Sequence, residues 1–270
     1  MNGDVAQIVA LTCHGNAVLR GKKTSRFFPS NSTCRFCDRI EFVEMVKPLF
    51  RNQREKVVAQ TPDSWFQWLA RKGASGIRLW WSRGNEVGTP DRMLAGFVGG
   101  GGTWTMEVRV PSGMSALWVA RHDVWNQDAP DNKIWRVTYG HVSDQDRSTL
   151  PELDMLAVSE HLLIALQDIH RFSDAHDCGG FTRCFDRAIG YLTTSNRSGF
   201  PNDLAPKGSI SPVAEAILDA CQSAWVFGGM GFWNDMGFDG KDQLEYNRVS
   251  KELFEALTDS LSSVATSSVT

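Results

Sequence analysis

Hydrophobic and polar residues follow different periods in the two halves of the chain. Before residue 149 the apolar residues form short segments separated by turn-forming residues, and after it they recur every three or four positions. A period of two residues is typical of half-buried strands, and a period of 3.6 is typical of amphipathic helices. The pattern predicts an α+β protein, with an antiparallel β-meander in the N-terminal half packed against a mainly helical C-terminal half.

The clearest predicted strand is 103–110, where Trp104, Met106 and Val108 alternate with polar residues. Further strands are predicted at 5–12, 33–43, 76–81, 115–123 and 133–141. The connections around the last strands are short and rich in turn formers, which favours antiparallel neighbours. Four glycines at 99–102 precede the clearest strand and are predicted to form a flexible hairpin turn.

One helix is predicted in the N-terminal half and four in the C-terminal half. The first begins at Thr61 and Pro62 and ends near Gly73. The others are predicted from a capping box at 149–152 towards Phe172, and at 181–192, 212–227 and 243–261. No repeat or linker divides the chain, so one integrated domain is expected over 1–261, β-rich in 1–148 and helical in 149–261. Small polar residues dominate 262–270, which is predicted to be a frayed tail.

Composition narrows the class of protein. The chain has 270 residues, of which 42% are hydrophobic and 22% charged, and its formal net charge is −3. These values are ordinary for a soluble globular protein. A nucleic-acid binder usually has a basic stripe, and a membrane span needs about 20 apolar residues. Neither feature is present in the sequence, so neither nucleic acid nor a membrane is expected as a partner.

The cysteines and the N-terminal residues indicate the cellular compartment in which the protein is expected. The six cysteines are Cys13, Cys34, Cys37, Cys178, Cys184 and Cys221. Six in a chain of this length are too sparse for a fold held by disulfides. Asp4 occupies a position where a secretory signal carries positive charge, and Gln7 interrupts the apolar stretch that follows. We therefore expect a cytoplasmic protein with reduced thiols.

Two groups of residues have metal-binding chemistry. Cys34 and Cys37 form a C-x-x-C pair, with Cys13 and His14 upstream as further ligands for zinc. Residues three apart on a strand point to opposite faces, which favours buried structural thiols instead.

The second group lies at 168–177. If the helix continues through it, His170, Asp174 and Asp177 share one face, and one imidazole with two carboxylates can hold a divalent transition metal. The alternative is a solvated helix end. Elsewhere, the adjacent His122 and Asp123 lie on a predicted strand and point to opposite faces, so they do not pair as a general base.

An aromatic, glycine-rich segment spans 224–238. If it is exposed, it offers a binding surface; if it is buried, it forms an aromatic corner between two helices, which is the commoner arrangement. The candidate binding residues are Trp225, Phe232, Trp233, Asn234 and Asp235. The run Trp-Val-Phe-Gly-Gly-Met-Gly, followed by Trp-Asn-Asp, resembles a stretch near the C-terminus of some uncharacterised bacterial proteins. The resemblance covers the last third of the chain and implies a bacterial origin but no activity.

The sequence favours a non-catalytic binding or interaction protein, for example an accessory or immunity-type protein. Phosphate-binding loops and nucleophile elbows are absent from it, and its ten tryptophans suit an interface. The expected partner is another protein or a small apolar ligand, without a cofactor. Two alternatives remain. One is a metal-dependent hydrolase that uses the cluster around His170, and the other is a small-ligand carrier with a cavity lined by Trp104, Trp118 and Trp135.

Overall fold

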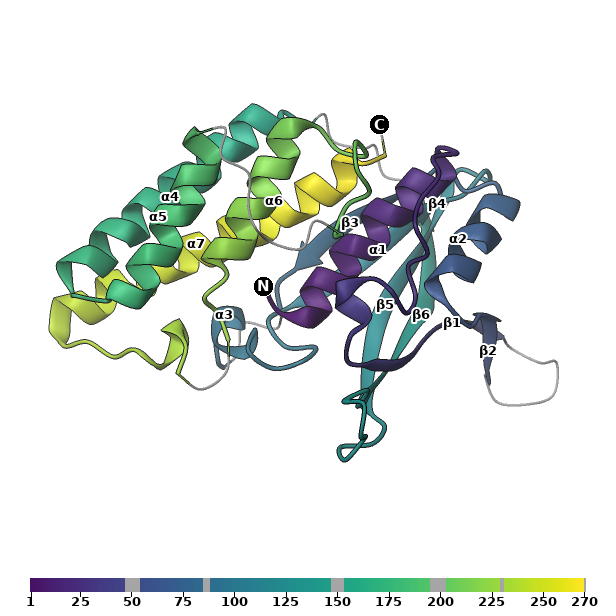
Figure 1. The fold of residues 1–270 in the computed structure, drawn as a ribbon, viewed down its shortest axis with the longest axis horizontal. Coiled ribbons are helices and arrows are strands. Elements are labelled where there is room, and N and C mark those ends of the chain that lie inside the picture. Colours follow the sequence, from purple (N-terminus) through teal and green to yellow (C-terminus); the bar gives the residue numbers. More distant parts are fainter. Residues whose placement is uncertain (47–53, 85–87, 147–152, 195–202, 229–230, 270) are drawn as a thin grey trace.

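A computed structural model describes residues 1–46, 54–84, 88–146, 153–194, 203–228 and 231–269 (Figure 1). Within these ranges the helices are α1 (Gly3–Leu19), α2 (Pro62–Arg71), α3 (Asp91–Leu94), α4 (Met155–Ala175), α5 (Gly179–Thr193), α6 (Pro212–Ala224) and α7 (Gly240–Ser267), with short 3-10 helices η1 (Ser32–Cys34) and η2 (Trp233–Asp235). The strands are β1 (Cys37–Val46), β2 (Arg54–Ala59), β3 (Gly76–Ser82), β4 (Thr103–Arg109), β5 (Met114–Val124) and β6 (Trp135–Asp146). The fold is α+β, as predicted.

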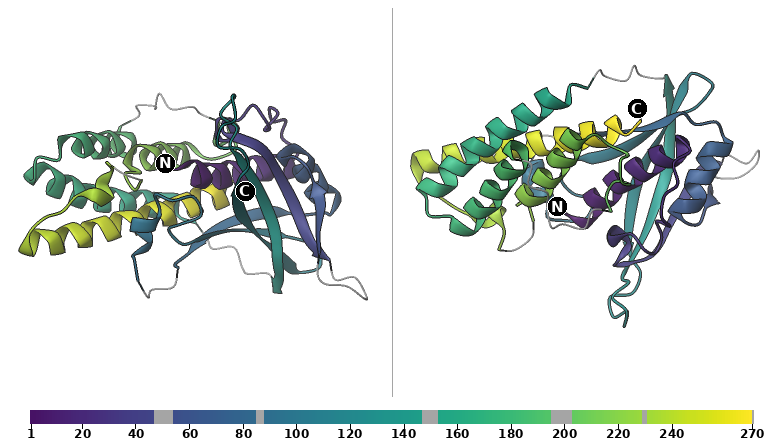
Figure 2. Two further views of the ribbon diagram at one scale, coloured as in Figure 1. Left: turned by 90° about the horizontal axis from the view of Figure 1, so that it is seen from below. Right: turned by 45° about the horizontal axis from the view of Figure 1, so that its top comes forward.

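The strands form one sheet in the order β2-β1-β6-β5-β4-β3. Strands β3 to β6 are an antiparallel meander, as the sequence indicated. The sheet as a whole is mixed, because β1 pairs in parallel with β6 and antiparallel with β2. After β2 the chain passes through α2 and begins the meander at the far edge, so the meander ends beside β1. The helices α4 to α7 form a bundle that extends sideways from the sheet (Figure 2).

The segment 5–12 was predicted as a strand, and this prediction is wrong, because it forms part of α1. The helix contacts β3, β4, α2 and α7, and residues 7–17 are all buried. A helix covered on every side is apolar all round and loses the 3.6-residue period. An apolar run of this kind does not distinguish a buried strand from a buried helix.

The predicted frayed tail at 262–270 is also wrong for the described residues. Helix α7 continues to Ser267, and its last turns lie against β3, the edge strand of the sheet. The Thr266 hydroxyl accepts a hydrogen bond from the Leu79 N–H (3.2 Å) and donates to the Leu79 carbonyl (3.1 Å). Small polar side chains thus take the place of a neighbouring strand along this edge.

A side chain of α1 binds the same strand edge two residues earlier, at Ile77. Asn16 donates from Nδ2 to the Ile77 carbonyl (2.8 Å), and its Oδ1 accepts from the Ile77 N–H (2.7 Å). The same Nδ2 donates to the Ser268 hydroxyl at 2.8 Å. Helices α1 and α7 are therefore joined to each other and to the sheet by fully buried hydrogen bonds.

Most of the other predicted elements are present. Helix α2 begins with a reciprocal capping box between Thr61 and Ser64, and α5 and β3 to β6 lie within a few residues of their predicted bounds. The predicted capping box at 149–152 lies outside the described residues, and α4 begins at Met155 with Asp154 as its N-cap. Helix α6 ends at Ala224, before the predicted 227. Strand β2 was missed because half of its residues are charged and most are exposed.

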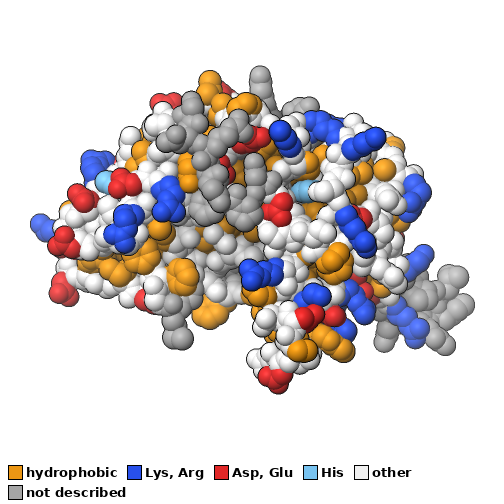
Figure 3. Space-filling model, viewed as in Figure 1, with side chains coloured by type: hydrophobic (Ala, Val, Ile, Leu, Met, Phe, Trp, Pro, Cys, Tyr) orange, Lys and Arg blue, Asp and Glu red, His pale blue; other side chains and the backbone are white. Residues whose placement is uncertain are grey.

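Two observations bear on the surroundings of this fold. Across the described ranges, every helix is too short or too polar to cross a membrane. On the face shown in Figure 3, acidic and basic side chains are interspersed over the surface.

His14, in the middle of α1, is a buried titratable group that we expect to make folding sensitive to acid. Its Nε2 lies 2.9 Å from the Asp203 carbonyl, and the ring is buried against Phe27. Burial lowers the pKa of His14 from its ordinary value of 6.5, and the Asp203 carbonyl opposes this shift in part. Below about pH 6.5 the unfolded chain therefore binds a proton more readily than the folded protein, and stability falls as pH falls.

We expect the free energy of unfolding to drop between about pH 7.5 and about pH 5.5, by up to about 1.4 kcal/mol per pH unit below the unfolded pKa. The His14→Gln variant should show a smaller drop in chemical denaturation measured at both pH values. His161→Gln, at an exposed position on α4, is the matched control. An equal drop in His14→Gln and the unmodified protein would contradict this assignment.

Candidate functional site

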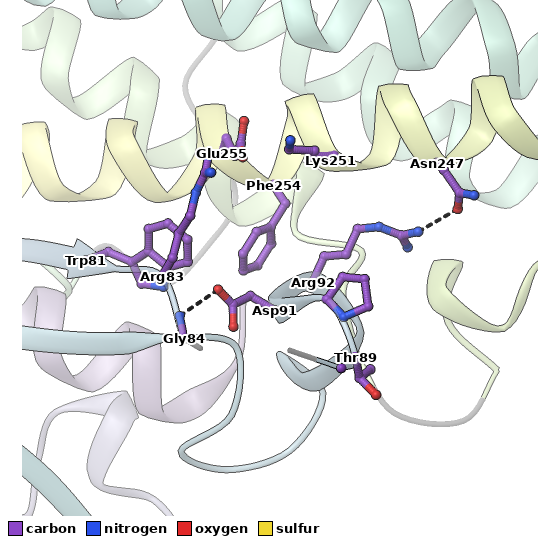
Figure 4. Close-up of a pocket in the computed structure, with 12 residues that line it drawn as sticks. Trp81, Arg83, Gly84, Thr89, Asp91, Arg92, Asn247, Lys251, Phe254 and Glu255 are labelled. Atoms are coloured by element: carbon purple, nitrogen blue, oxygen red, sulfur yellow. Dashed lines mark hydrogen bonds and ion pairs between the residues drawn. The ribbon is translucent and has the colours of Figure 1, made fainter. Parts of the chain in front are cut away.

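A cavity of about 510 Å3 lies where the end of β3, residues 83–84 and 88–92, and α7 meet, as shown in Figure 4. We call it the α3–α7 cavity. Its walls include Trp81 of β3, Arg92 of α3, and Asn247, Lys251 and Phe254 of α7. The volume is within the range of pockets that bind small molecules.

One face of α7 supplies a complete side of this cavity. Asn247, Lys251, Phe254 and Glu255 are spaced at i, i+4, i+7 and i+8, so they lie on one face of α7, and the Phe254 ring projects from it into the space above α3 (Figure 4). The ring of Phe254 meets the ring of Trp81 edge to face, with centroids 5.7 Å apart. Sequence reasoning missed this site. The helical spacing of polar residues around the predicted inner residue Phe254 was the signal that could have found it.

The glycines at 99–102 hold the opposite wall in place. Trp81 donates from Nε1 to the Gly101 carbonyl at 2.7 Å. A Cβ on Gly102 would lie 2.4 Å from that same nitrogen, and a Cβ on Gly100 would lie 2.3 Å from the Leu94 carbonyl. The backbone therefore approaches α3 and Trp81 more closely than a side chain allows. This segment joins α3 to β4 as a tightly packed support, so the predicted flexible hairpin turn is wrong.

The cavity contains two cations without a carboxylate partner among the described residues. Arg92 is only 8% exposed, and its guanidinium donates to the Asn247 Oδ1 (2.8 Å) and lies 5.3 Å from the Tyr246 ring centroid. Lys251 is exposed at the mouth, with no hydrogen bond or ion pair to any residue that the structure places. Arg92 on α3 and Lys251 on α7 thus place two positive charges where these two helices face each other.

The two carboxylates of the cavity already have partners in its walls. Glu255 forms an ion pair with Arg83, and the Asp91 Oδ2 accepts a hydrogen bond from the Gly84 N–H at 2.9 Å. A buried guanidinium without a counter-charge is costly, because its desolvation is not repaid by an ion pair. The arrangement around Arg92 can therefore accept an anion.

The aromatic segment after α6 is mostly a buried corner. Trp225, Trp233 and Asn234 are buried, whereas Phe232 is 46% exposed and Asp235 is exposed. Binding by these five residues stays a prediction, and of the five only Phe232 and Asp235 reach the surface. Asn234 has a different role in the structure, because its Nδ2 donates to the Arg92 carbonyl at 2.7 Å and so helps to position α3 beside the cavity.

The metal site predicted from His170, Asp174 and Asp177 does not form. Helix α4 ends at Ala175, and Asp177 has a positive φ of 54°, so the helical spacing stops before the third ligand. The Nε2 of His170 instead lies 2.8 Å from the Asp186 Oδ1 of α5. Over the residues that the structure describes, no three His, Cys, Asp or Glu side chains lie close enough to hold a metal ion.

The cysteines are unpaired, and most are buried. Cys34 and Cys37 lie in the core, and Cys37 accepts a hydrogen bond from the Gln7 side chain at 3.4 Å. Burial raises the pKa of the Cys34 thiol to about 12, with the neighbouring Cys37 adding to the shift. Burial likewise raises the pKa of Cys13 to about 12. These thiols are protonated at neutral pH, which favours the structural interpretation.

The tryptophans proposed to line a carrier cavity do not do so together. Trp118 is buried in the core, where its ring contacts those of Phe42, Trp65 and Trp68. Trp104 lines a separate, smaller cavity. Comparisons with protein-family models, with curated proteins and with solved structures find no match. Fold and site together define an α+β protein with a cation-lined cavity between its sheet and its helical bundle.

Proposed function

We propose that this protein is a non-catalytic binding protein that takes a small organic anion in the α3–α7 cavity. The observation that carries the proposal is the buried guanidinium of Arg92, which has no carboxylate partner among the described residues. A bound carboxylate or phosphate would supply that counter-charge through charge-assisted hydrogen bonds. Lys251 adds a second positive charge at the mouth.

The other walls favour a ligand with a flat apolar part. Trp81 and Phe254 contribute aromatic surface beside the two cations, and the volume of about 510 Å3 exceeds what an inorganic anion fills. Ligand sites in proteins combine mainly apolar walls with a few placed polar groups in this way. An aromatic or bicyclic acid matches both features.

The side chains of the cavity favour binding over catalysis. Its described lining holds no histidine, cysteine or serine, and its one hydroxyl side chain is that of Thr89. Glu255 pairs with Arg83, and Asp91 accepts the Gly84 N–H, so both carboxylates have structural roles.

The test is isothermal titration calorimetry with 2-naphthoate as the anionic probe and 2-naphthamide as its neutral isostere. We expect saturable binding of the acid and none of the amide. Lys251→Met should weaken binding about three- to fivefold, as for an exposed ion pair, and Arg92→Met about tenfold or more. The matched control is Lys56→Met on β2, an exposed position at the other end of the sheet (Figure 1).

Equal binding of the acid and the amide would overturn the proposal, and so would equal losses in Lys251→Met and Lys56→Met. Absence of saturable binding for 2-naphthoate, 2-naphthyl phosphate and adenosine monophosphate at millimolar concentration would also overturn it. Circular dichroism verifies that each variant, Arg92→Met in particular, is folded.

A further inference from the structure

The surface around the C-terminal end of α1 carries a group of lysines and arginines. Over much of Figure 3 side chains of both signs are interspersed, but at the upper right, where α1 ends in Figure 1, Lys and Arg predominate. We call this surface the α1-end patch. Its members are the half-buried Arg20 and the exposed Lys22, Lys23, Arg26 and Lys207.

The local backbone brings these side chains together. Helix α1 ends in a Schellman motif, in which Gly21 has a φ of 73° and the Lys22 N–H donates to the Ala17 carbonyl at 2.9 Å. The chain leaves the helix at this point, and the Lys22 Nζ donates to the Gly208 carbonyl at 2.5 Å. Because these two residues are 186 positions apart, this bond joins two distant loops and brings Lys207 to the same surface.

The cations of the patch have no carboxylate partner among the residues that the structure describes. Arg20 donates to the Ser209 carbonyl at 2.8 Å, so a neutral group holds it and its charge is not compensated. The carboxylates of the adjoining segments are those of Asp63 and Asp203, and both accept hydrogen bonds from backbone N–H groups of 27–32. The patch is therefore a local excess of positive charge.

Helix dipoles explain only part of this excess. A cation near a helix C-terminus is stabilised by the dipole, which accounts for Arg20 and for Arg71 and Lys72 at the end of α2, the helix that packs beside α1. Lys23 and Lys207 lie on loops, and their side chains have no hydrogen bond or ion pair within the described chain. Gathering like charges costs free energy in the isolated protein, and a bound polyanion removes that cost.

We propose that the α1-end patch binds the phosphate backbone of a nucleic-acid duplex, independently of base sequence. Lysines and arginines without carboxylate partners neutralise phosphates and release the counterions condensed on them. Hydroxyl groups also donate to phosphates, and Thr24 and Ser25 lie between Lys23 and Arg26. The net charge of −3, from which no nucleic acid was expected, averages over the whole chain and does not reveal this patch.

Other polyanionic partners fit this surface less well. No large hydrophobic side chain is exposed among the described residues of 18–32 and 203–210. Stable membrane binding needs an apolar anchor in addition to basic residues. Single-stranded nucleic acids stack on exposed aromatic rings, and protein interfaces have an apolar core. A duplex presents phosphates at its surface and needs none of these features.

Fluorescence anisotropy with a fluorescein-labelled DNA duplex of about 20 base pairs tests the proposal. At low salt we expect saturable binding that differs less than about threefold between two unrelated sequences. For about three to five phosphate contacts, affinity should fall about 40- to 500-fold between about 50 and 200 mM salt. Lys23→Gln/Lys207→Gln should weaken binding about tenfold or more, and should lower the slope of log affinity against log salt by about one for each lost contact.

The matched control is Lys56→Gln/Lys241→Gln, which removes the same charge at exposed positions on β2 and α7. Equal changes in the two double variants would overturn the proposal, and so would the absence of saturable binding up to about 0.1 mM protein at about 50 mM salt. Tighter binding to phosphatidylserine vesicles or to polyglutamate than to the duplex would overturn it as well. Lys23→Gln/Lys207→Gln should bind 2-naphthoate normally, so this proposal and the one for the α3–α7 cavity fail independently.

Discussion

Replacing Trp233 by alanine should lower the free energy of unfolding by about 3–5 kcal/mol, the cost of truncating a large buried aromatic side chain. Trp233 has no exposed surface, and its ring meets those of Phe181, Phe185 and Tyr246. These partners lie on α5 and α7, so the single side chain connects two helices of the bundle. Its loss leaves a cavity that the rigid surroundings fill only in part.

One hydrogen bond adds to the cost. The Trp233 indole donates from Nε1 to the Ser250 hydroxyl at 2.7 Å, whereas the bond from the Tyr246 hydroxyl to the Trp233 carbonyl (2.6 Å) involves the backbone and remains possible in alanine. Without the indole, the buried Ser250 hydroxyl loses a partner. Because Asn234 follows directly and holds the Arg92 carbonyl, we also expect weaker 2-naphthoate binding in Trp233→Ala.

Phe232→Ala is the control for this prediction. The two aromatic residues are adjacent in sequence, but Phe232 is 46% exposed and lacks comparable packing. We expect it to change stability by less than about 1 kcal/mol. Urea unfolding followed by circular dichroism gives both values. Similar losses in the two variants would show that the corner depends on the segment as a whole and would refute the role given to Trp233.

The sequence predicted the meander and the cap of α2 because both depend on residues that are close together in the chain. Alternation along 103–110 matches the two-residue period of β4, although its central residues 105–108 are buried on both faces. Thr61 with Ser64 closes a capping box within a few residues. The parallel pairing of β1 with β6 depends on where the chain returns after β2, about a hundred residues away in sequence. Nothing in the residues of β1 specifies that neighbour.

The errors have a shared physical origin in long-range burial. Helix α1 lost its periodic signal because sheet and helices surround it. The end of α7 reads as a polar tail because its hydroxyls bind a strand edge nearly two hundred residues earlier in the chain. Likewise, the α3–α7 cavity combines Arg92 with Lys251, and only the spacing along α7 hinted at it.

The hydrogen bonds of Asn16 to β3 lead to the second large effect. Asn16→Leu preserves the size of the side chain but leaves the Ile77 N–H and C=O without their partners at a fully buried position. Each unsatisfied buried group costs about 1–3 kcal/mol, so we expect the loss of two partners to lower the free energy of unfolding by about 2–6 kcal/mol. Thr266→Val removes the two equivalent bonds to Leu79 and should cost a similar amount.

Thr12→Val separates this effect from a general sensitivity of α1. The Thr12 hydroxyl is equally buried, but it donates only to the Ile8 carbonyl of its own helix (2.9 Å). Its loss should cost less than about 1 kcal/mol, because no strand group is left unpaired. Amide hydrogen exchange gives a site-specific measurement: protection should fall at Ile77 in Asn16→Leu and at Leu79 in Thr266→Val. Unchanged protection at these amides would refute the pairing, because an edge strand held by side chains exchanges once they are removed.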